Sequence, residues 1–124
     1  MIIRKATEDY LEAMLMVKEK WGYIRSTDVA KQLGVTKPSV TYTTKRLRGA
    51  GYITMDSDNM ITLTDAGMEI AARIYERHNL LAKFFMKLGV DETTAREDAC
   101  KVEHDLSKET FDAICRHVRN GNKV

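Results

Sequence analysis

The sequence predicts a mostly helical fold with a small β-hairpin, arranged as a winged helix-turn-helix followed by further helices. Three observations lead to this prediction: most of the chain has apolar residues at helical spacing, two short β-favouring runs interrupt that pattern, and a glycine separates the two helices before them. The 124 residues suffice for one compact domain or two small substructures. With 44% hydrophobic and 31% charged residues, the chain can bury a core, so disorder is a poor interpretation.

An amphipathic helix is predicted from Thr7 to about Lys20. Its apolar residues recur every three to four positions and therefore form one stripe, and the Thr7 hydroxyl can cap its start. Trp21-Gly22 marks its end.

The next two predicted helices span residues 26–33 and about 36–49. Either of the first two residues, Ser26 or Thr27, can cap the earlier helix, and the glycine after it can end it in a left-handed conformation. Two β-favouring runs, 52–55 and 60–63, then flank the turn-forming sequence Asp-Ser-Asp-Asn. This pattern predicts a β-hairpin.

Three further helices are predicted after the hairpin. The first is long and amphipathic and covers residues 64–87. Asp91 can cap the second, expected over 92–105, and Ser107 can cap a last helix that continues through Val118.

Two helices, a glycine between them and a hairpin are the order of a winged helix-turn-helix, whose second helix enters the DNA major groove. Residues 25–53 hold six basic residues against the lone Asp28, an excess that suits a phosphate backbone. The alternative is a solvated helical face with incidental lysines. Side chains expected to face outward and contact DNA are Arg25, Ser26, Lys37, Pro38, Ser39, Thr41, Tyr42, Thr44, Lys45 and Arg48.

A module of this size buries only about 600–1,000 Å² on a duplex, so specificity usually requires two copies on a near-palindromic site. We therefore expect a homodimer on double-stranded DNA. The helices after residue 64 carry more apolar side chains than the N-terminal half can cover. These form either the dimer interface or an internal core: Leu80, Leu81, Phe84, Phe85, Phe111 and Ile114.

Six side chains have the oxygen, nitrogen and sulfur donors that bind first-row divalent ions. They are Asp9, Glu12, His78, Cys100, Glu103 and His104. Helical spacing places the first two on one face, and the last three on another. Other interpretations stay open from the residues alone: a solvated carboxylate pair, a surface histidine, or a small buried hydrophobe at Cys100.

Four blocks of the chain carry a family resemblance: Ala-Thr-Glu-Asp-Tyr-Leu-Glu at 6–12, Val-Thr-Lys-Pro-Ser-Val-Thr at 35–41, Arg-His-Asn-Leu-Leu at 77–81 and Cys-Lys-Val-Glu-His-Asp-Leu-Ser at 100–107. Together they resemble the diphtheria toxin repressor family. The resemblance covers nearly the whole chain. It implies a winged helix-turn-helix DNA-binding domain over residues 1–63 and a helical metal-binding and dimerisation domain over residues 64–124.

The resemblance also implies metal ligands. Asp9, Glu12, His78, Glu103 and His104 match ligand positions of the short manganese-responsive branch. Cys100 departs from that branch, which has glutamate there, and matches the iron-responsive branch, which has methionine where Asp9 stands. Hard oxygen donors favour Mn²⁺ and place Fe²⁺ next, whereas a thiolate shifts preference toward Fe²⁺, Co²⁺ or Zn²⁺, so Zn²⁺ or Co²⁺ could bind in vitro.

The implied function is a repressor that binds operator DNA as a dimer when loaded with Mn²⁺ or Fe²⁺ and controls metal-uptake genes. One alternative is a winged-helix regulator that senses a redox or other non-metal effector at Cys100. An enzyme is disfavoured because the sequence has no His-Glu-x-x-His, phosphate-loop or Gly-x-Ser-x-Gly motif. Only two cysteines, no apolar membrane span and a charged N-terminus lead us to expect a cytoplasmic protein without membrane association.

Overall fold

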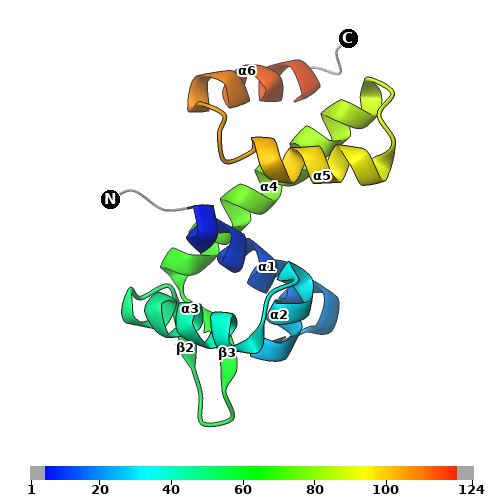
Figure 1. Cartoon of the computed structure of the whole chain (residues 1–124). Coiled ribbons are helices and arrows are strands. Elements are labelled where there is room, and N and C mark those ends of the chain that lie inside the picture. Colours follow the sequence, from blue (N-terminus) through cyan, green and yellow to red (C-terminus); the bar gives the residue numbers. More distant parts are fainter. Residues whose placement is uncertain (1–4, 120–124) are drawn as a thin grey trace. The chain divides into compact units, whose positions relative to one another are not determined.

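The computed structural model describes residues 5–119 and has helices with one small antiparallel sheet (Figure 1). The predicted fold class is confirmed. The chain divides into two compact units, Met1–Arg73 and Ile74–Val124. Among the described residues, no helix combines the length and apolar character needed to cross a membrane.

Three helices form most of the first unit: α1 (Lys5–Trp21), α2 (Ser26–Leu33) and α3 (Lys37–Gly49). Helix α2 packs against both α1 and α3. Gly34 ends α2 with φ 69°, the left-handed conformation expected there. Deeply buried side chains from the helices and strands fill the core: Leu11, Met14, Val17, Ile24, Val29, Val40 and Ile53.

The helix caps agree only in part with expectation. The helix expected to start near residue 36 begins at Lys37, and Thr36, which was not predicted as a cap, caps it: its hydroxyl accepts a hydrogen bond from the Ser39 amide at 3.3 Å. Thr7 is not the cap of α1, because the helix already includes it in the first described turn. Ser26 and Thr27 both lie inside α2, so Arg25 takes the cap position, without a capping bond from its own side chain among the described residues.

The sheet has three short strands in the order β1-β3-β2, all antiparallel: β1 (Ile24–Arg25), β2 (Ile53–Met55) and β3 (Met60–Leu63). Strands β2 and β3 form the predicted hairpin. The Asp56 carboxylate accepts two backbone amide hydrogen bonds in its turn, at 2.9 and 3.0 Å, and Asn59 has a φ of 61°. Strand β1 was not predicted, since two residues are too few to show an alternating pattern.

Helix α4 (Asp65–Lys87) starts directly after the hairpin. Thr64 caps it: its hydroxyl accepts a hydrogen bond from the Gly67 amide at 3.2 Å and donates one to the Gly51 carbonyl at 2.7 Å. The backbone of Gly67 lies so close to the Tyr52 carbonyl that a Cβ at this position would overlap the oxygen. This contact fixes the first turn of α4 against the end of the segment that leads into β2.

The second unit contains the rest of α4 together with α5 (Glu92–Val102) and α6 (Lys108–Arg119). Asp91 and Ser107 cap these two helices as predicted, each accepting a backbone amide hydrogen bond at 3.1 Å. Helix α5 is three residues shorter than expected. Residues 103–105 continue as a turn, in which the Val102 carbonyl accepts the amides of Asp105 and Leu106 at 2.9 and 3.2 Å.

The core of the second unit accounts for much of the apolar set noted in the sequence. Leu81, Ala82 and Ala99 form its buried centre. Partly buried side chains pack around them: Phe85, Met86, Leu106, Phe111 and Ile114. The internal-core interpretation therefore holds for four residues of the set, namely Leu81, Phe85, Phe111 and Ile114.

Candidate DNA-binding surface and metal centre

Helix α3 has one buried face. Val40, Thr44 and Leu47 recur at i, i+4 and i+7 and are all buried. The Thr44 hydroxyl donates a hydrogen bond to the Thr41 carbonyl at 3.1 Å, so its polar group is satisfied within the helix. The expectation that Thr44 faces outward is wrong, because helical periodicity places it between the two core residues.

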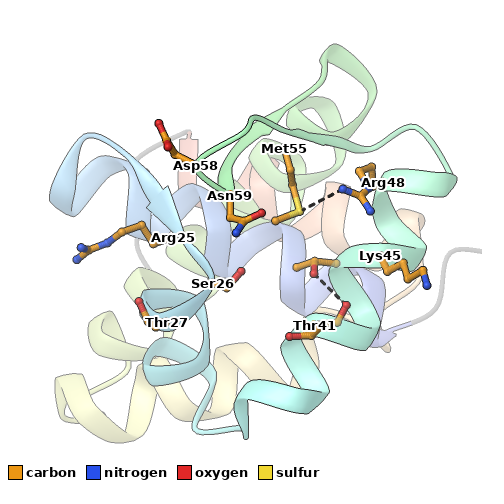
Figure 2. A pocket seen from close by; sticks show the side chains of 10 residues that line it. Arg25, Ser26, Thr27, Thr41, Lys45, Arg48, Met55, Asp58 and Asn59 are labelled. Atoms are coloured by element: carbon orange, nitrogen blue, oxygen red, sulfur yellow. Dashed lines mark hydrogen bonds between the residues drawn. The ribbon is translucent and has the colours of Figure 1, made fainter.

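The other predicted DNA contacts are accessible. Ser26 is half-buried, and the remainder are exposed: Arg25, Lys37, Pro38, Ser39, Thr41, Tyr42, Lys45 and Arg48. A groove runs between the start of α2, the middle of α3 and the hairpin, and its lining includes Ser26, Lys45, Arg48 and Asn59 (Figure 2). This groove therefore combines hydroxyl and amide groups with cations, the two kinds of side chain that hydrogen-bond to nucleic acid and neutralise phosphates.

Arg25 is held at the beginning of α2. Its Nε donates a hydrogen bond to the Asp28 carboxylate at 3.0 Å, and this bond raises the pKa of the Arg25 guanidinium. The guanidinium carbon also lies 4.9 Å from the centre of the Tyr23 ring. Arg25 is thus an oriented cation whose charge Asp28 partly offsets.

One exposed cation of α3 was missed from the sequence. Arg46 Nη1 donates a hydrogen bond to the Tyr42 hydroxyl at 3.0 Å, and its guanidinium carbon lies 5.7 Å from the centre of that ring. Tyr42 is 63% exposed, so both side chains are at the surface. The signal was present, because residues four apart are neighbours on a helix surface.

Four predicted metal ligands lie in the second unit, and the structure brings them together. Donor atoms of His78, Cys100 and Glu103 all lie within 4.8 Å of one another. The two Glu103 oxygens lie 3.5 Å from His78 Nδ1 and 3.3 Å from His104 Nε2. His78 comes from α4 and Cys100 from the last turn of α5, while Glu103 and His104 stand in the turn that follows.

These residues fit a divalent cation. Glu103 is fully buried, and neither of its carboxylate oxygens accepts a hydrogen bond from any described residue. A buried carboxylate without such donors is costly unless a positive charge compensates it. A sulfur donor and a nitrogen or oxygen donor on one ion lie at most about 4.4 Å apart, the sum of metal–ligand distances of about 2.3 and 2.1 Å. A small side-chain adjustment would therefore place all three donors on one cation.

The remaining predicted ligands, Asp9 and Glu12, belong to the first unit. They lie three residues apart on α1; Glu12 is buried and Asp9 is half-buried. The second cysteine, Cys115, is buried on α6, and burial raises the pKa of its thiol. Cys100, by contrast, is exposed.

Comparison with known proteins agrees with a DNA-binding surface in the first part of the chain and a metal centre in the second. Residues 3–59 match the family model described as iron dependent repressor, N-terminal DNA binding domain. Residues 64–123 match the model described as iron dependent repressor, metal binding and dimerisation domain. The chain belongs to the iron-dependent repressor family. The resemblance to the diphtheria toxin repressor family is thereby confirmed.

Individual relatives support the same assignment. The chain is 39% identical over 112 residues to an HTH-type transcriptional regulator of Methanocaldococcus jannaschii, covering 89% of this chain and 90% of that protein. It is 37% identical over 111 residues to the transcriptional regulator MntR of Salmonella typhimurium, covering 90% and 71%. A solved manganese-dependent transcriptional repressor in complex with manganese has a TM-score of 0.79 at 25% identity, covering 93% of this chain but only 52% of that one.

As a member of this iron-dependent repressor family, the chain is a metal-dependent transcriptional regulator with a DNA-binding domain and a metal-binding and dimerisation domain. Its partners are DNA, a divalent metal ion and a second copy of the chain. The family consists of regulators, so the expectation that this protein is not an enzyme is confirmed.

Proposed function

We propose that this regulator is a repressor that binds a near-palindromic operator as a homodimer when loaded with Mn²⁺, with Fe²⁺ as its second choice, and that it controls metal-uptake genes. The observation that carries the proposal is the cluster of His78, Cys100 and Glu103, whose donor atoms lie within 4.8 Å of one another. We assign DNA binding to residues 1–63, and metal binding and dimerisation to residues 64–124.

The donor set supports manganese over iron. Glu103 offers two buried carboxylate oxygens, and Asp9 and Glu12 stay predicted ligands that would add further hard oxygen donors. Cys100 is the one soft donor, and it could bind through its backbone carbonyl rather than its thiol. The solved manganese-dependent repressor that this chain resembles is consistent with the same ion.

The exposed face of α3 is the proposed reader of the operator. Tyr42 and Lys45 lie on the side of the helix away from the buried residues, where they would meet base edges and phosphates. Ser39 and Thr41 supply hydroxyls beside them. Arg48 lines the groove toward the hairpin, and Arg25 stands at the start of α2, so both would neutralise backbone phosphates.

Metal binding and DNA binding are coupled because the bound ion orders the protein. A bound divalent ion supplies the positive charge that the buried Glu103 carboxylate lacks. His78, Glu103 and His104 would then be held in a single arrangement, which lowers the ordering cost of the DNA-binding dimer. By linkage, operator DNA must tighten metal binding by the same factor.

The experiment starts with selection of duplexes from a random library by the Mn²⁺-loaded full chain. The enriched sequence should show two-fold symmetry, and fluorescence anisotropy should give tight binding with Mn²⁺, weaker binding with Fe²⁺ and loss of binding with chelator. Glu103→Gln is the matched variant, since it keeps the shape and removes the charge. Equal affinity in all three conditions would refute metal control.

Redox control through Cys100 predicts a different outcome. Glu103→Gln would then leave operator binding intact with and without Mn²⁺, and oxidant would release the wild type but not Cys100→Ser.

A further inference from the structure

Arg77 lies next to His78 on α4, yet its side chain reaches the turn that follows α5. Arg77 Nη2 donates a hydrogen bond to the Leu106 carbonyl at 3.2 Å. The acceptor is 29 residues further along the chain, so the bond is a tertiary contact and not part of helix α4. The turn it reaches carries Glu103 and His104.

The peptide groups of Leu106 are anchored on two sides. Its amide donates to the Val102 carbonyl at 3.2 Å, which ties the turn to the end of α5. Its carbonyl accepts from Arg77, which ties the same residue to α4. A short segment bonded to two helices loses most of its alternative conformations. The Arg77 bond therefore restrains the Leu106 carbonyl, which α5 does not bind.

Arg77 also contacts α6. Its guanidinium carbon lies 4.5 Å from the centre of the Phe111 ring, within the range of a cation–π contact. Phe111 packs in turn against the buried centre formed by Leu81, Ala82 and Ala99. One half-buried side chain thus joins α4, the turn and α6. A lysine can supply the charge and a hydrogen bond but not the planar stacking surface.

We propose that Arg77 is a positioning residue of the metal centre, which holds residues 103–107 so that Glu103 stands against His78 before an ion binds. This inference rests on the proposed function, because it takes His78, Glu103 and His104 as ligands. Ligands ordered in advance cost less to assemble around an ion. Loss of a group that orients ligands typically weakens metal binding about 10- to 100-fold.

The test compares Arg77→Met and Arg77→Lys with the wild-type full chain. In metal-free protein, amide hydrogen exchange should accelerate selectively at residues 103–107 in Arg77→Met and less in Arg77→Lys. Competition with a fluorescent chelator should show Mn²⁺ affinity reduced about 10- to 100-fold in Arg77→Met, with partial recovery in Arg77→Lys. Arg116→Met, at an exposed arginine of α6, is the control and should change neither readout.

Three results would overturn the inference. Unchanged exchange at residues 103–107 in Arg77→Met would show that the turn does not need the arginine. Faster exchange with wild-type Mn²⁺ affinity would separate the turn from metal binding. A uniform rise in exchange over residues 74–119 would indicate a general structural role. Absence of Mn²⁺ binding by the wild type would instead contradict the proposed function, while the metal-free exchange data would still decide whether Arg77 holds the turn.

Discussion

Arg46 donates a hydrogen bond to the hydroxyl of Tyr42 at 3.0 Å, across one turn of α3 and on the side away from its buried face. The bond restricts two long exposed side chains that would otherwise sample many rotamers. A guanidinium held in this way is prepared for a planar partner such as the edge of guanine, to which arginine binds through two hydrogen bonds. The pair is therefore a candidate determinant of operator specificity.

Removing either member of the pair should reduce discrimination between operators. Arg46→Lys keeps the charge but loses the planar guanidinium that can donate two parallel hydrogen bonds. We expect the binding free energy to weaken by about 1–3 kcal/mol on the preferred sequence and to change little on random DNA. Tyr42→Phe should have a smaller effect in the same direction. Fluorescence anisotropy at constant salt measures both. A loss of equal size on every sequence would instead identify Arg46 as a phosphate contact.

Local signals in the sequence predicted most of the fold. Gly34, Asp91 and Ser107 each act through their own backbone or a nearby amide, and each was assigned correctly as a helix stop or cap. The errors arise where tertiary contacts decide. Helix α5 ends three residues early, at a turn whose Leu106 carbonyl accepts a hydrogen bond from Arg77 of α4, a contact between residues 29 apart that no local pattern in the sequence predicts.

The candidate metal site was likewise predictable where local spacing decides and not where tertiary packing decides. Spacing alone placed Cys100 and Glu103 on one side of a predicted helix. It could not show that His78, from α4, approaches both, since that depends on how α4 and α5 pack. Thr44 is the opposite case: its burial follows from helical periodicity, and the outward assignment overlooked the stripe that Val40 and Leu47 define.

The identity of the residue at position 100 should tune the metal preference. Cys100→Glu replaces the soft donor by a hard one, so affinity for Mn²⁺ should rise relative to Co²⁺ and Zn²⁺. Chelator competition with each ion gives the ratio. Wild-type protein loaded with Co²⁺ should also show a thiolate-to-metal charge-transfer band, which Cys100→Glu and Cys100→Ser both lose. A band that persists in Cys100→Ser would contradict a bond to this thiol.

Gly67→Ala should destabilise the protein although alanine normally favours a helix. The new Cβ would overlap the Tyr52 carbonyl oxygen, and because both partners are backbone the clash cannot be relieved by a rotamer change. We expect a loss of about 1–3 kcal/mol in the free energy of unfolding. Urea denaturation of the full chain measures it.

Gly49→Ala provides the matched control for this substitution. Gly49 is also helical, and no described heavy atom outside its local helical surroundings lies within 4 Å of the position its Cβ would occupy. The free energy of unfolding of Gly49→Ala should equal that of the wild type or exceed it by up to about 1 kcal/mol. Equal destabilisation by the two alanines would show that the close approach at Gly67 is not the cause.

Burial of Cys115 should make stability depend on pH in the alkaline range. Cys115 is 6% exposed, and burial raises the pKa of its thiol, so the folded protein holds this proton more tightly than the unfolded chain. The resulting stabilisation is fully present below the unfolded pKa of about 8.5 and is lost as pH rises through the higher folded value. Urea midpoints should therefore fall between about pH 7 and about pH 9.5.

The two cysteines separate this effect from other alkaline titrations. Cys115→Ala should be less stable near neutral pH but should show a shallower alkaline decline, because the titrating thiol is gone. Cys100→Ser should keep the wild-type slope, since Cys115 is still present. Iodoacetamide should modify the exposed Cys100 well before Cys115 in the native protein. An unchanged alkaline slope in Cys115→Ala would assign the pH dependence to another group.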